Sequence, residues 1–375
     1  MVTKKNDEIK LCAVGDVVVN REDPKSMWAL AAPIIRQSDI AFCQLEAPIS
    51  EKYGYLQTHA WGPPRSHPRT IEAFSDAGFN VISYASNNAM DWGPDCFLDT
   101  IENLRKSGIQ VVGAGKNIVE ARKPVIIEVK GTRIGFLAYC SIILAGFAAG
   151  PNKPGIAPMW AWTVYHQVEH DQPGTPCEIL TFADRNDLQA MIEDIKKLRP
   201  QVDVLAVSHH WGIHFIPATI AMYQPEVAHA AIDAGADIIL GHHPHLLKGI
   251  EIYKGKGIFY SMNMFSLDIQ PGIAFGSMAE ETAKRYGWKI DPEYSLFPFG
   301  EEARKTILVR CLIAGKEIQK ISFLPALINK QNQPEILTRK SKDFDKVVGY
   351  MEEITRNQKL NAKFIVEGDE VVISI

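Results

Sequence analysis

The sequence predicts an α/β protein in which strands and helices alternate along much of the chain. Short apolar runs that end in Gly, Asp, Asn or His are separated by segments whose apolar residues recur at helical spacing. Such alternation is typical of sheets whose strands are connected by helices. From Gly131 onward, hairpin-like strand pairs also occur. We therefore expect mixed sheets that share one interior.

The predicted strands and helices follow from these patterns in chain order. Unbroken apolar runs predict strands that are buried on both faces, namely Ile9–Asp16, Asp39–Glu46, Asn80–Asn88, Asp203–His210 and Ala236–His243. Amphipathic patterns predict helices, namely Asp95–Gly108, Asp184–Arg199 and Gln224–Gly235. Strands of the hairpin type are expected over Arg133–Cys140, Gly249–Ser261 and Thr306–Pro325.

The expected domain organisation is one main domain with two additions. The main domain covers residues 8–325 and carries a lid-like insertion at about 144–180. Within that insertion, Leu144–Pro176 is rich in Gly and Pro, and so long a loop is usually a functional lid or a disordered insertion. Residues 326–375 form an extension, in which Asp343–Ile375 predicts one helix and a terminal strand packed on the same domain.

Composition excludes several classes of protein. The 375 residues are 46% hydrophobic and 22% charged, as in an ordinary globular protein with a substantial core. The net charge of -4 and the pI near 6.3 do not fit a nucleic-acid-binding protein. The six scattered cysteines form no CxxC pair and are expected to be reduced core residues. Without a signal peptide or a membrane-spanning segment in this sequence, we expect a cytoplasmic protein.

Polar side chains follow five of the predicted strands, at the point where each strand ends. They are Asp16, Glu46, Asn87 with Asn88, His209 with His210, and the histidines of "GHHPH", His242, His243 and His245. Ligands of α/β sheets bind beyond the carboxyl ends of the strands, where these residues would converge. Carboxylate, imidazole and amide ligands suit Mn, Fe or Zn. Taken one at a time, the same residues could equally be helix caps, turns or core-edge histidines.

Five segments of the chain resemble a known family. They are "AVGDVVVNR" (Ala13–Arg21), "DIAFCQLEAPIS" (Asp39–Ser50), the run Ser86–Gly115, "HHWGIHF" (His209–Phe215) and the run Ala234–Asp268. In this order they are similar to the capsule-synthesis, or poly-γ-glutamate (CapA-type, PGA_cap), proteins of the calcineurin-like metallophosphoesterase superfamily. The resemblance implies a four-layer α/β/β/α sandwich with two mixed sheets.

The resemblance also implies a metal centre that would hold two divalent ions. By position it assigns the metal ligands Asp16, Glu46, Asn88, His210, His243 and His245, with Glu46 as a bridge and His242 as a neighbour. Two ions bridged by a carboxylate are the usual arrangement for hydrolysing phosphate esters or amides by a metal-bound hydroxide.

The chain departs from the family pattern at four positions. Ala89 stands where the "NNH" motif has the histidine that helps to protonate the leaving group, a group commonly worth 10²–10⁴-fold in rate. Val18 replaces a second histidine ligand of the wider superfamily, Gln44 replaces an asparagine, and Met262 replaces a glycine.

Several residues are expected to act on the substrate or in proton transfer. His210, Asp91 and His59 are the candidate catalytic residues, the last two as stand-ins for the missing histidine. The candidates for binding an anionic substrate are Arg65, Arg69, His67, Asn87 and Trp160. The loop that carries Arg65, His67 and Arg69 could equally be a simple polar connection.

Two functions of different classes remain open from the sequence. The first is a metal-dependent hydrolase that acts on an anionic γ-glutamyl, amide or phosphoester substrate, which is either a small molecule or a polymer. The second is a catalytically degraded relative that binds an anionic polymer or a partner without turnover, which Ala89 and Val18 favour.

Overall fold

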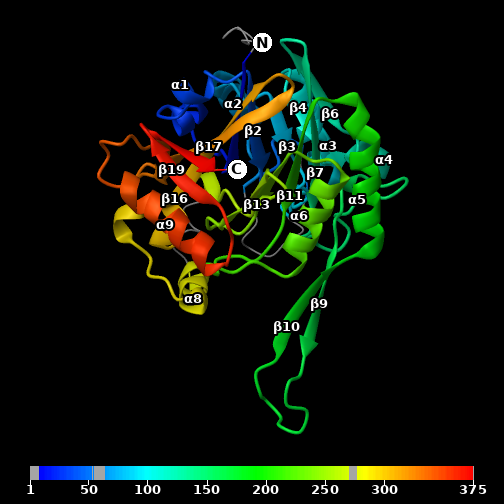
Figure 1. Cartoon of the computed structure of the whole chain (residues 1–375), viewed down its shortest axis with the longest axis vertical. Coiled ribbons are helices and arrows are strands. Elements are labelled where there is room, and N and C mark those ends of the chain that lie inside the picture. The colour runs from blue at the N-terminus through cyan, green and yellow to red at the C-terminus, as the bar shows by residue number, and fades with distance from the viewer. Residues whose placement is uncertain (1–7, 53, 55–63, 270–276, 375) are drawn as a thin grey trace.

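The computed structural model describes residues 8–52, 54, 64–269 and 277–374 of the chain. Within these residues two mixed sheets pack against each other (Figure 1). The larger has ten strands, with the central order β19-β20-β17-β16-β1-β2-β3-β4, while β15 pairs with β1 and β18 with β17. Its strands are β1 (Ile9–Val18), β2 (Ile40–Leu45), β3 (Val81–Ser83), β4 (Gln110–Val112), β15 (Met264–Leu267), β16 (Lys305–Ala314), β17 (Glu317–Ile328), β18 (Pro334–Ile336), β19 (Lys363–Glu367) and β20 (Glu370–Ser374).

The second sheet has six strands in the order β13-β14-β12-β11-β7-β6. These strands are β6 (Val125–Val129), β7 (Thr132–Cys140), β11 (Val204–His210), β12 (Ile238–His242), β13 (Ile250–Tyr253) and β14 (Lys256–Phe259). Its central pairs β7–β11 and β11–β12 are parallel, whereas β6–β7 and β13–β14 are antiparallel hairpins. The prediction of mixed sheets is confirmed.

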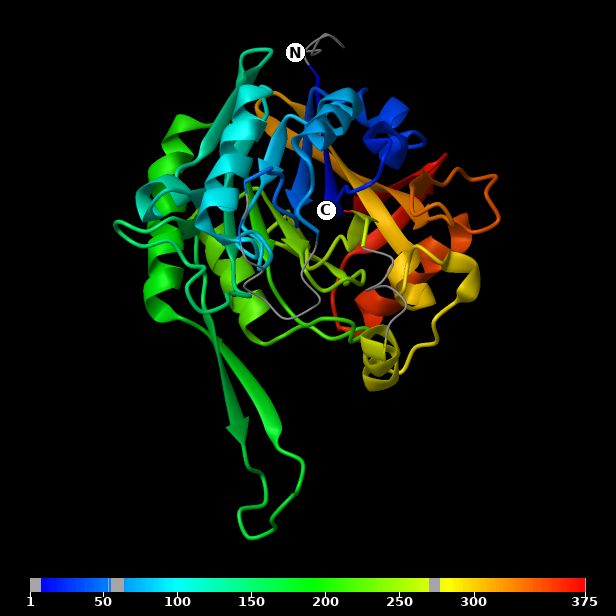
Figure 2. The ribbon, with the colours of Figure 1, turned by 180° about the vertical axis from the view of Figure 1, so that it is seen from behind.

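Helices cover the outer faces of the two sheets, which gives the order helix, sheet, sheet, helix (Figures 1 and 2). They are α1 (Ala32–Ile35), α2 (Ile71–Ala77), α3 (Gly93–Lys106), α4 (Ile118–Ala121), α5 (Arg185–Leu198), α6 (Tyr223–Ala234), α8 (Ser277–Tyr286) and α9 (Phe344–Asn357). Between the sheets, Phe42 of β2 stacks on Phe136 of β7 with ring centroids 5.8 Å apart. The layers α/β/β/α implied by the family resemblance are confirmed.

The C-terminal residues contact the six-stranded sheet and add two strands to the ten-stranded sheet. Helix α9 contacts the six-stranded sheet, because Thr355 accepts a hydrogen bond from the Ile250 amide and Gln358 accepts one from the Gly249 amide. Two strands then follow, and β20 pairs with β17 of the ten-stranded sheet. The prediction of a single terminal strand was wrong, since residues Lys363–Ser374 turn back on themselves as an antiparallel pair.

The Gly/Pro-rich segment contains more regular structure than its composition indicates. It includes the short strand β8 (Gly155–Ile156), which pairs with β5 (Ala114–Gly115), and the strand β9 (Ala161–His166). Strand β9 pairs with β10 (Glu178–Ala183) in a hairpin that projects from the body of the protein (Figure 2). Trp162, Tyr165 and Ile179 of this hairpin are exposed.

Two sequence-based expectations concern cysteines and membrane segments. All six cysteines are free, and five are buried as expected, whereas Cys177 is exposed beside β10. Among the helices formed by the described residues, none combines the length and the apolar character that crossing a bilayer requires.

Parallel pairing brings the carboxyl ends of the central strands to one rim. Strands β1, β2 and β3 run parallel in one sheet, and β11 and β12 run parallel in the other. The pairing of β1 with β2 and with β15 shifts register next to Asp16. Such irregularities bend a strand and redirect a side chain. Here the Asp16 carboxylate lies against His242, at the end of β12, and against the main-chain amide of His243.

Gly15 allows the chain to pass closely beside Asn263, directly before Asp16. A Cβ atom at Gly15 would lie only 1.7 Å from the Asn263 carbonyl oxygen, which also accepts a hydrogen bond from the Asp16 amide at 2.9 Å. We predict that Gly15→Ala lowers the free energy of unfolding by about 1–3 kcal/mol, the usual range for overpacking. Urea unfolding measures this change.

The matched control for this prediction is Gly349→Ala in α9. An added Cβ there meets no atom within 4 Å, and replacing glycine within a helix usually adds about 0.5–1 kcal/mol of stability. Equal effects of the two substitutions would contradict a steric role for Gly15.

Candidate metal centre

Five of the side chains predicted to gather at the rim, Asp16, Glu46, His210, His243 and His245, do so in the structure. Their metal-binding atoms form two overlapping groups, Glu46 with His210 and His243, and Asp16 with Glu46 and His245. Within each group these atoms lie within 4.8 Å of one another, and all the residues are buried. Because Glu46 belongs to both groups, its carboxylate is in position to bridge two ions.

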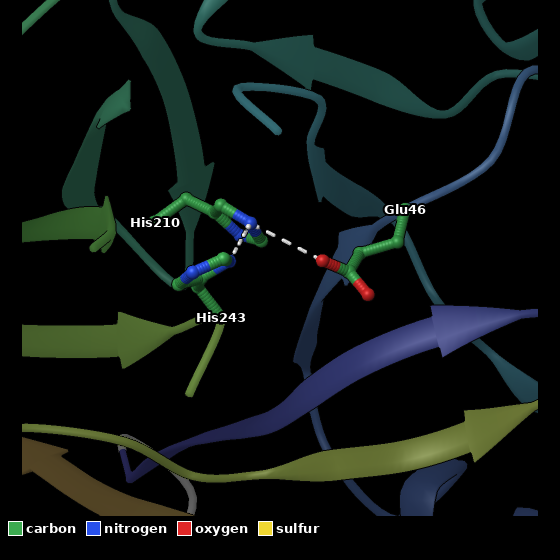
Figure 3. A group of neighbouring side chains, drawn as sticks. All are labelled: Glu46, His210 and His243. Carbon is green, nitrogen blue, oxygen red and sulfur yellow. Dashed lines mark hydrogen bonds and ion pairs between the residues drawn. The ribbon is translucent and has the colours of Figure 1, made fainter. Parts of the chain in front are cut away.

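The first group is compact (Figure 3). His210 Nε2 lies 3.2 Å from Glu46 Oε1 and 3.2 Å from His243 Nδ1. The same His210 nitrogen lies 2.6 Å from the amide oxygen of Asn87. One imidazole nitrogen, one carboxylate oxygen and one amide oxygen therefore lie close around His210 Nε2.

The second group is wider. His245 Nδ1 lies 3.7 Å from Asp16 Oδ2, and His245 Nε2 lies 3.7 Å from Glu46 Oε2. Asp16 also links this group to the first, because its Oδ1 atom lies 3.9 Å from His210 Nδ1. The spacing leaves the ring of His245 between the two carboxylates.

The charge state of the site is dominated by burial. Burial, with the nearby Asp16 and Asp91 carboxylates, raises the pKa of Glu46 well above its ordinary value. Burial lowers the pKa of His210 and of His245 to about 3, and it lowers that of His243 well below its usual range. Neutral imidazoles are the form that binds metals, and an ionised Glu46 needs a cation to compensate its charge.

Unpaired polar atoms provide a separate test of whether a metal fits. Asp16 Oδ1, Glu46 Oε1, His210 Nδ1 and His245 Nδ1 are buried and form no hydrogen bond to any described residue. Buried polar groups of native proteins are nearly always paired, so four such atoms in one cluster indicate a missing partner. Oxygen and imidazole donors together fit a divalent ion of the Mn, Fe or Zn type.

The turn after β12 has an unusual backbone that serves the site. His243 has φ 91° and His245 has φ 51°, a left-handed conformation that is uncommon outside glycine. In this conformation the His243 amide donates a hydrogen bond of 2.9 Å to Asp16 Oδ2. Strained residues of this kind cluster at functional sites, where the surrounding structure holds them.

The asparagine pair differs from its sequence-based assignment. The family resemblance implies Asn88 as the metal ligand, and the sequence offers Asn87 as a substrate-binding residue. In the structure it is the side-chain oxygen of Asn87 that lies against His210, at 2.6 Å from Nε2. The main-chain N–H of Asn88 donates to Ser86 Oγ at 3.1 Å. We therefore assign the candidate ligand role to Asn87, one position earlier in the turn.

His214 has a place in this cluster that the sequence analysis missed. Its ring stacks on His243 at 3.8 Å and on His245 at 4.8 Å between centroids, so it contacts one imidazole of each group. Its position four residues after His210, in "HHWGIHF", was the available signal. His242, expected to be a neighbour of the site, lies with Nδ1 3.3 Å from Asp16 Oδ1.

The candidates for proton transfer lie in different surroundings. Asp91 is buried, and its charge contributes to the raised pKa of Glu46, which places it within electrostatic reach of the cluster. Ala89 is completely buried in the apolar core. His59 lies outside the described residues.

The residues predicted to bind substrate make mostly local contacts. Arg65 donates to the main-chain carbonyls of Glu51 and Lys52, and His67 Nε2 lies 2.9 Å from a Glu51 carboxylate oxygen. Arg69 is exposed. The Trp160 amide donates to Asp187 at 2.9 Å at the base of the projecting hairpin.

The sequence is similar to a family of bacterial proteins and to individual members of known name. The sequence model of the family described as "Bacterial capsule synthesis protein PGA_cap" matches residues 10–266. The "PGA biosynthesis protein CapA" of Bacillus subtilis (strain 168) is 30% identical over 275 residues, which cover 71% of this chain and 65% of the relative. The "Capsule biosynthesis protein CapA" of Bacillus anthracis is 28% identical over 275 residues, which cover 71% of this chain and 61% of the relative.

A solved structure, the calcineurin-like phosphoesterase YfkN from Bacillus subtilis, is similar at 12% identity and a TM-score of 0.38, with 94% of this chain and 97% of that chain covered. The matches to the two curated Bacillus relatives span less than two thirds of the length of each. The family model, by contrast, matches well over half of this chain and includes every strand end that contributes to the candidate metal centre. The chain therefore belongs to the PGA_cap family of bacterial capsule synthesis proteins.

Proposed function

We propose that this protein is a divalent-metal-dependent hydrolase that acts on an anionic γ-glutamyl, amide or phosphoester substrate. The observation that carries the proposal is the sharing of Glu46 by two groups of metal-binding side chains. Membership of the PGA_cap family supports an anionic polymer as the substrate, since similar proteins are named for capsule and PGA biosynthesis.

The residues of the chain would divide the work between them. Asp16, Glu46, Asn87, His210, His243 and His245 would hold the metal. Bound divalent ions would supply Lewis acidity and lower the pKa of water. Asp91 is the candidate for proton transfer, because it is a buried carboxylate within electrostatic reach of Glu46.

Binding of the anionic substrate would fall to the loop that follows β2. Arg69 is exposed and has no ion pair to a described residue, so its guanidinium is available for a carboxylate or a phosphate. Arg65 and His67 would shape this loop through their contacts with Glu51 and Lys52.

A second function, binding without turnover, is favoured by one observation. Ala89 stands where the related motif has a proton-donating histidine, and its methyl group is packed in the core. In this alternative the same metal centre would bind an anionic polymer and release it unchanged.

Metal analysis and turnover assays test the proposal and separate the two functions. We expect purified protein to bind Mn, Fe or Zn and, with added Mn, to hydrolyse either a generic phosphodiester or a γ-glutamyl amide. His243→Ala is expected to lower turnover by about 10²-fold or more, since even groups that only support metal ligands are worth 10–100-fold. His166→Ala is the matched control, because His166 is an exposed imidazole on β9.

Three results would decide between the readings. Metal binding with turnover that His243→Ala abolishes supports the hydrolase. Metal binding without turnover of either substrate, unchanged by Ala89→His, supports the binding function. Protein that binds no metal, and whose His243→Ala variant melts like the wild type, rules out the metal centre.

A further inference from the structure

The two groups of metal-binding side chains differ in how many donors they offer. In the first group, Asn87 adds a neutral oxygen to the carboxylate of Glu46 and the imidazoles of His210 and His243. The distances from His210 Nε2 to the other three donors are 2.6–3.2 Å. Four donors that meet this closely match the coordination number of a borderline divalent ion.

The second group has three donors, and one of them is already engaged. Asp16 Oδ2 accepts the His243 amide at 2.9 Å, so one of the two Asp16 oxygens is already bound to the main chain. Each carboxylate oxygen has only two lone pairs to share. An ion at this position therefore competes with the His243 amide for Asp16 Oδ2. The spacing is also wider than in the first group, because His245 Nδ1 lies 3.7 Å from Asp16 Oδ2 and His245 Nε2 lies 3.7 Å from Glu46 Oε2.

The surroundings of the second group are largely apolar in the described structure. His242 Nδ1 lies 3.3 Å from Asp16 Oδ1, but His242 belongs to neither group of donor atoms that lie within 4.8 Å of one another. Val18, Leu246 and Met264 are buried and pack in one apolar cluster beside Asp16 and His245. His214 lies close to His245 but stacks on its face at an interplanar angle of 17°. The lone pairs of imidazole nitrogens lie in the plane of the ring. Because the rings of His214 and His245 are stacked, their lone pairs lie in nearly parallel planes and do not converge on one ion.

Charge adds to this inequality. Two divalent ions bring four positive charges, which exceed the charge carried by the Asp16, Glu46 and Asp91 carboxylates together. The first ion is attracted by all of this negative charge. The second ion is also repelled by the first, because both would bind Glu46. An anion bound at the centre would supply the missing negative charge.

We propose that the two ions bind with unequal affinities and that an anionic ligand promotes binding of the second. The first ion is held by Glu46, Asn87, His210 and His243, and the second is held more weakly by Asp16, Glu46 and His245. This inference rests on the proposed function, and it adds that occupancy of the second position depends on the supply of metal and on the presence of a phosphate or carboxylate group.

Manganese titration of the full-length metal-free protein, followed by the EPR signal of free Mn²⁺, tests this proposal. We expect two classes of sites whose Kd values differ by at least about 10-fold. Inorganic phosphate is expected to strengthen the weaker class by at least about fivefold, within the usual range of coupling between ligands. These measurements require no turnover.

Variants assign each class to its residues. Asp16→Asn and, independently, His245→Gln are expected to remove the weaker class and the effect of phosphate while the stronger class remains. Asn87→Ala is expected to weaken the stronger class about 10-fold. His166→Ala should leave both classes unchanged, and circular dichroism confirms that each variant is folded.

The outcomes separate this inference from the function on which it rests. Two classes of equal affinity, or loss of the stronger class in both Asp16→Asn and His245→Gln, overturn the inference but leave a metal-dependent hydrolase possible. An absence of phosphate dependence overturns its anion-coupled part. Protein that binds no manganese in either class overturns the proposed function itself.

Discussion

The Glu46→Gln variant is expected to lose both metal ions and yet, without metal, to be at least as stable as the wild-type protein. Glu46 is the one residue that belongs to both groups of metal-binding side chains in the described structure. A neutral amide cannot replace a bridging carboxylate, so we expect less than about a tenth of the wild-type metal content, given that weaker perturbations already cost 10–100-fold in affinity.

The expected gain in stability without metal follows from the electrostatics of Glu46. Burial and the neighbouring Asp16 and Asp91 carboxylates raise the pKa of Glu46 well above its ordinary value. At neutral pH the folded protein must therefore either ionise Glu46 at a cost or take up a proton. Each unit by which the pKa is raised corresponds to about 1.4 kcal/mol, and glutamine removes this penalty.

Two measurements on Glu46→Gln check the expected loss of metal and the expected stability of the metal-free protein. Elemental analysis gives the metal content, and thermal unfolding with and without added Mn gives the stabilisation by metal, which Glu46→Gln should abolish. Glu178→Gln is the matched control, because Glu178 is an exposed carboxylate on β10. A Glu46→Gln protein that keeps one full ion, or that is clearly less stable than metal-free wild type, would contradict this assignment.

The candidate metal centre could be predicted from the sequence because its position depends on a regular property of the fold. Parallel strands present their carboxyl ends at a common rim, so Asp16, Glu46, His210, His243 and His245 could be grouped from five separate runs. The resemblance to the PGA_cap proteins then supplied the two packed sheets. Neither step required a contact to be known in advance.

Two features of the candidate site, the contact of Asn87 with His210 and the stacking of His214, depend on local backbone geometry and could not be predicted from the sequence. The predicted strand Asn80–Asn88 ends already at Ser83, because the chain turns and the Tyr84 hydroxyl donates to the Ala89 carbonyl at 2.8 Å. This turn brings the side-chain oxygen of Asn87 to His210. The stacking of His214 on two imidazoles likewise depends on the loop after β11, in which Phe215 has φ 55°.

The projecting hairpin of β9 and β10 was not predicted from the sequence, for a different reason. Pro and Gly in Leu144–Pro176 predict an irregular loop, but the strand-forming residues of β9 and β10 pair across it. The signal for β10 lies in Glu178–Ala183, beyond the biased stretch. Because the composition was averaged over Leu144–Pro176, the six strand-forming residues of β9 within it were not recognised.

Acid should destabilise the metal-free protein steeply, starting below about pH 6.5. Burial lowers the pKa of His209, His210 and His245 to about 3 in the folded state, compared with an ordinary value of 6.5. Between these values the unfolded chain binds protons that the folded protein does not. The stability contributed by the neutral histidines is therefore fully present above pH 6.5 and is lost as the pH falls towards 3.

The size of this effect follows from the number of protons. Each histidine that must stay neutral lowers the free energy of unfolding by about 1.4 kcal/mol per pH unit below 6.5. The three with a pKa of about 3 together give a slope of roughly 4 kcal/mol per unit. Glu46 opposes them, because its raised pKa lets the folded protein take up a proton as the pH falls, and this offsets about one histidine.

Urea unfolding of the protein in EDTA at several pH values between 5 and 8 measures this slope. His209→Phe is the sharpest variant, because His209 is stacked between Tyr139 and Trp211 and belongs to neither group of metal-binding side chains. Phenylalanine preserves an aromatic ring there and removes one titrating group, so the slope should fall by about 1.4 kcal/mol per pH unit. An unchanged slope would mean that His209 is protonated or solvated in the folded protein, and the same histidine-rich interior could then no longer be taken as neutral and ready for metal.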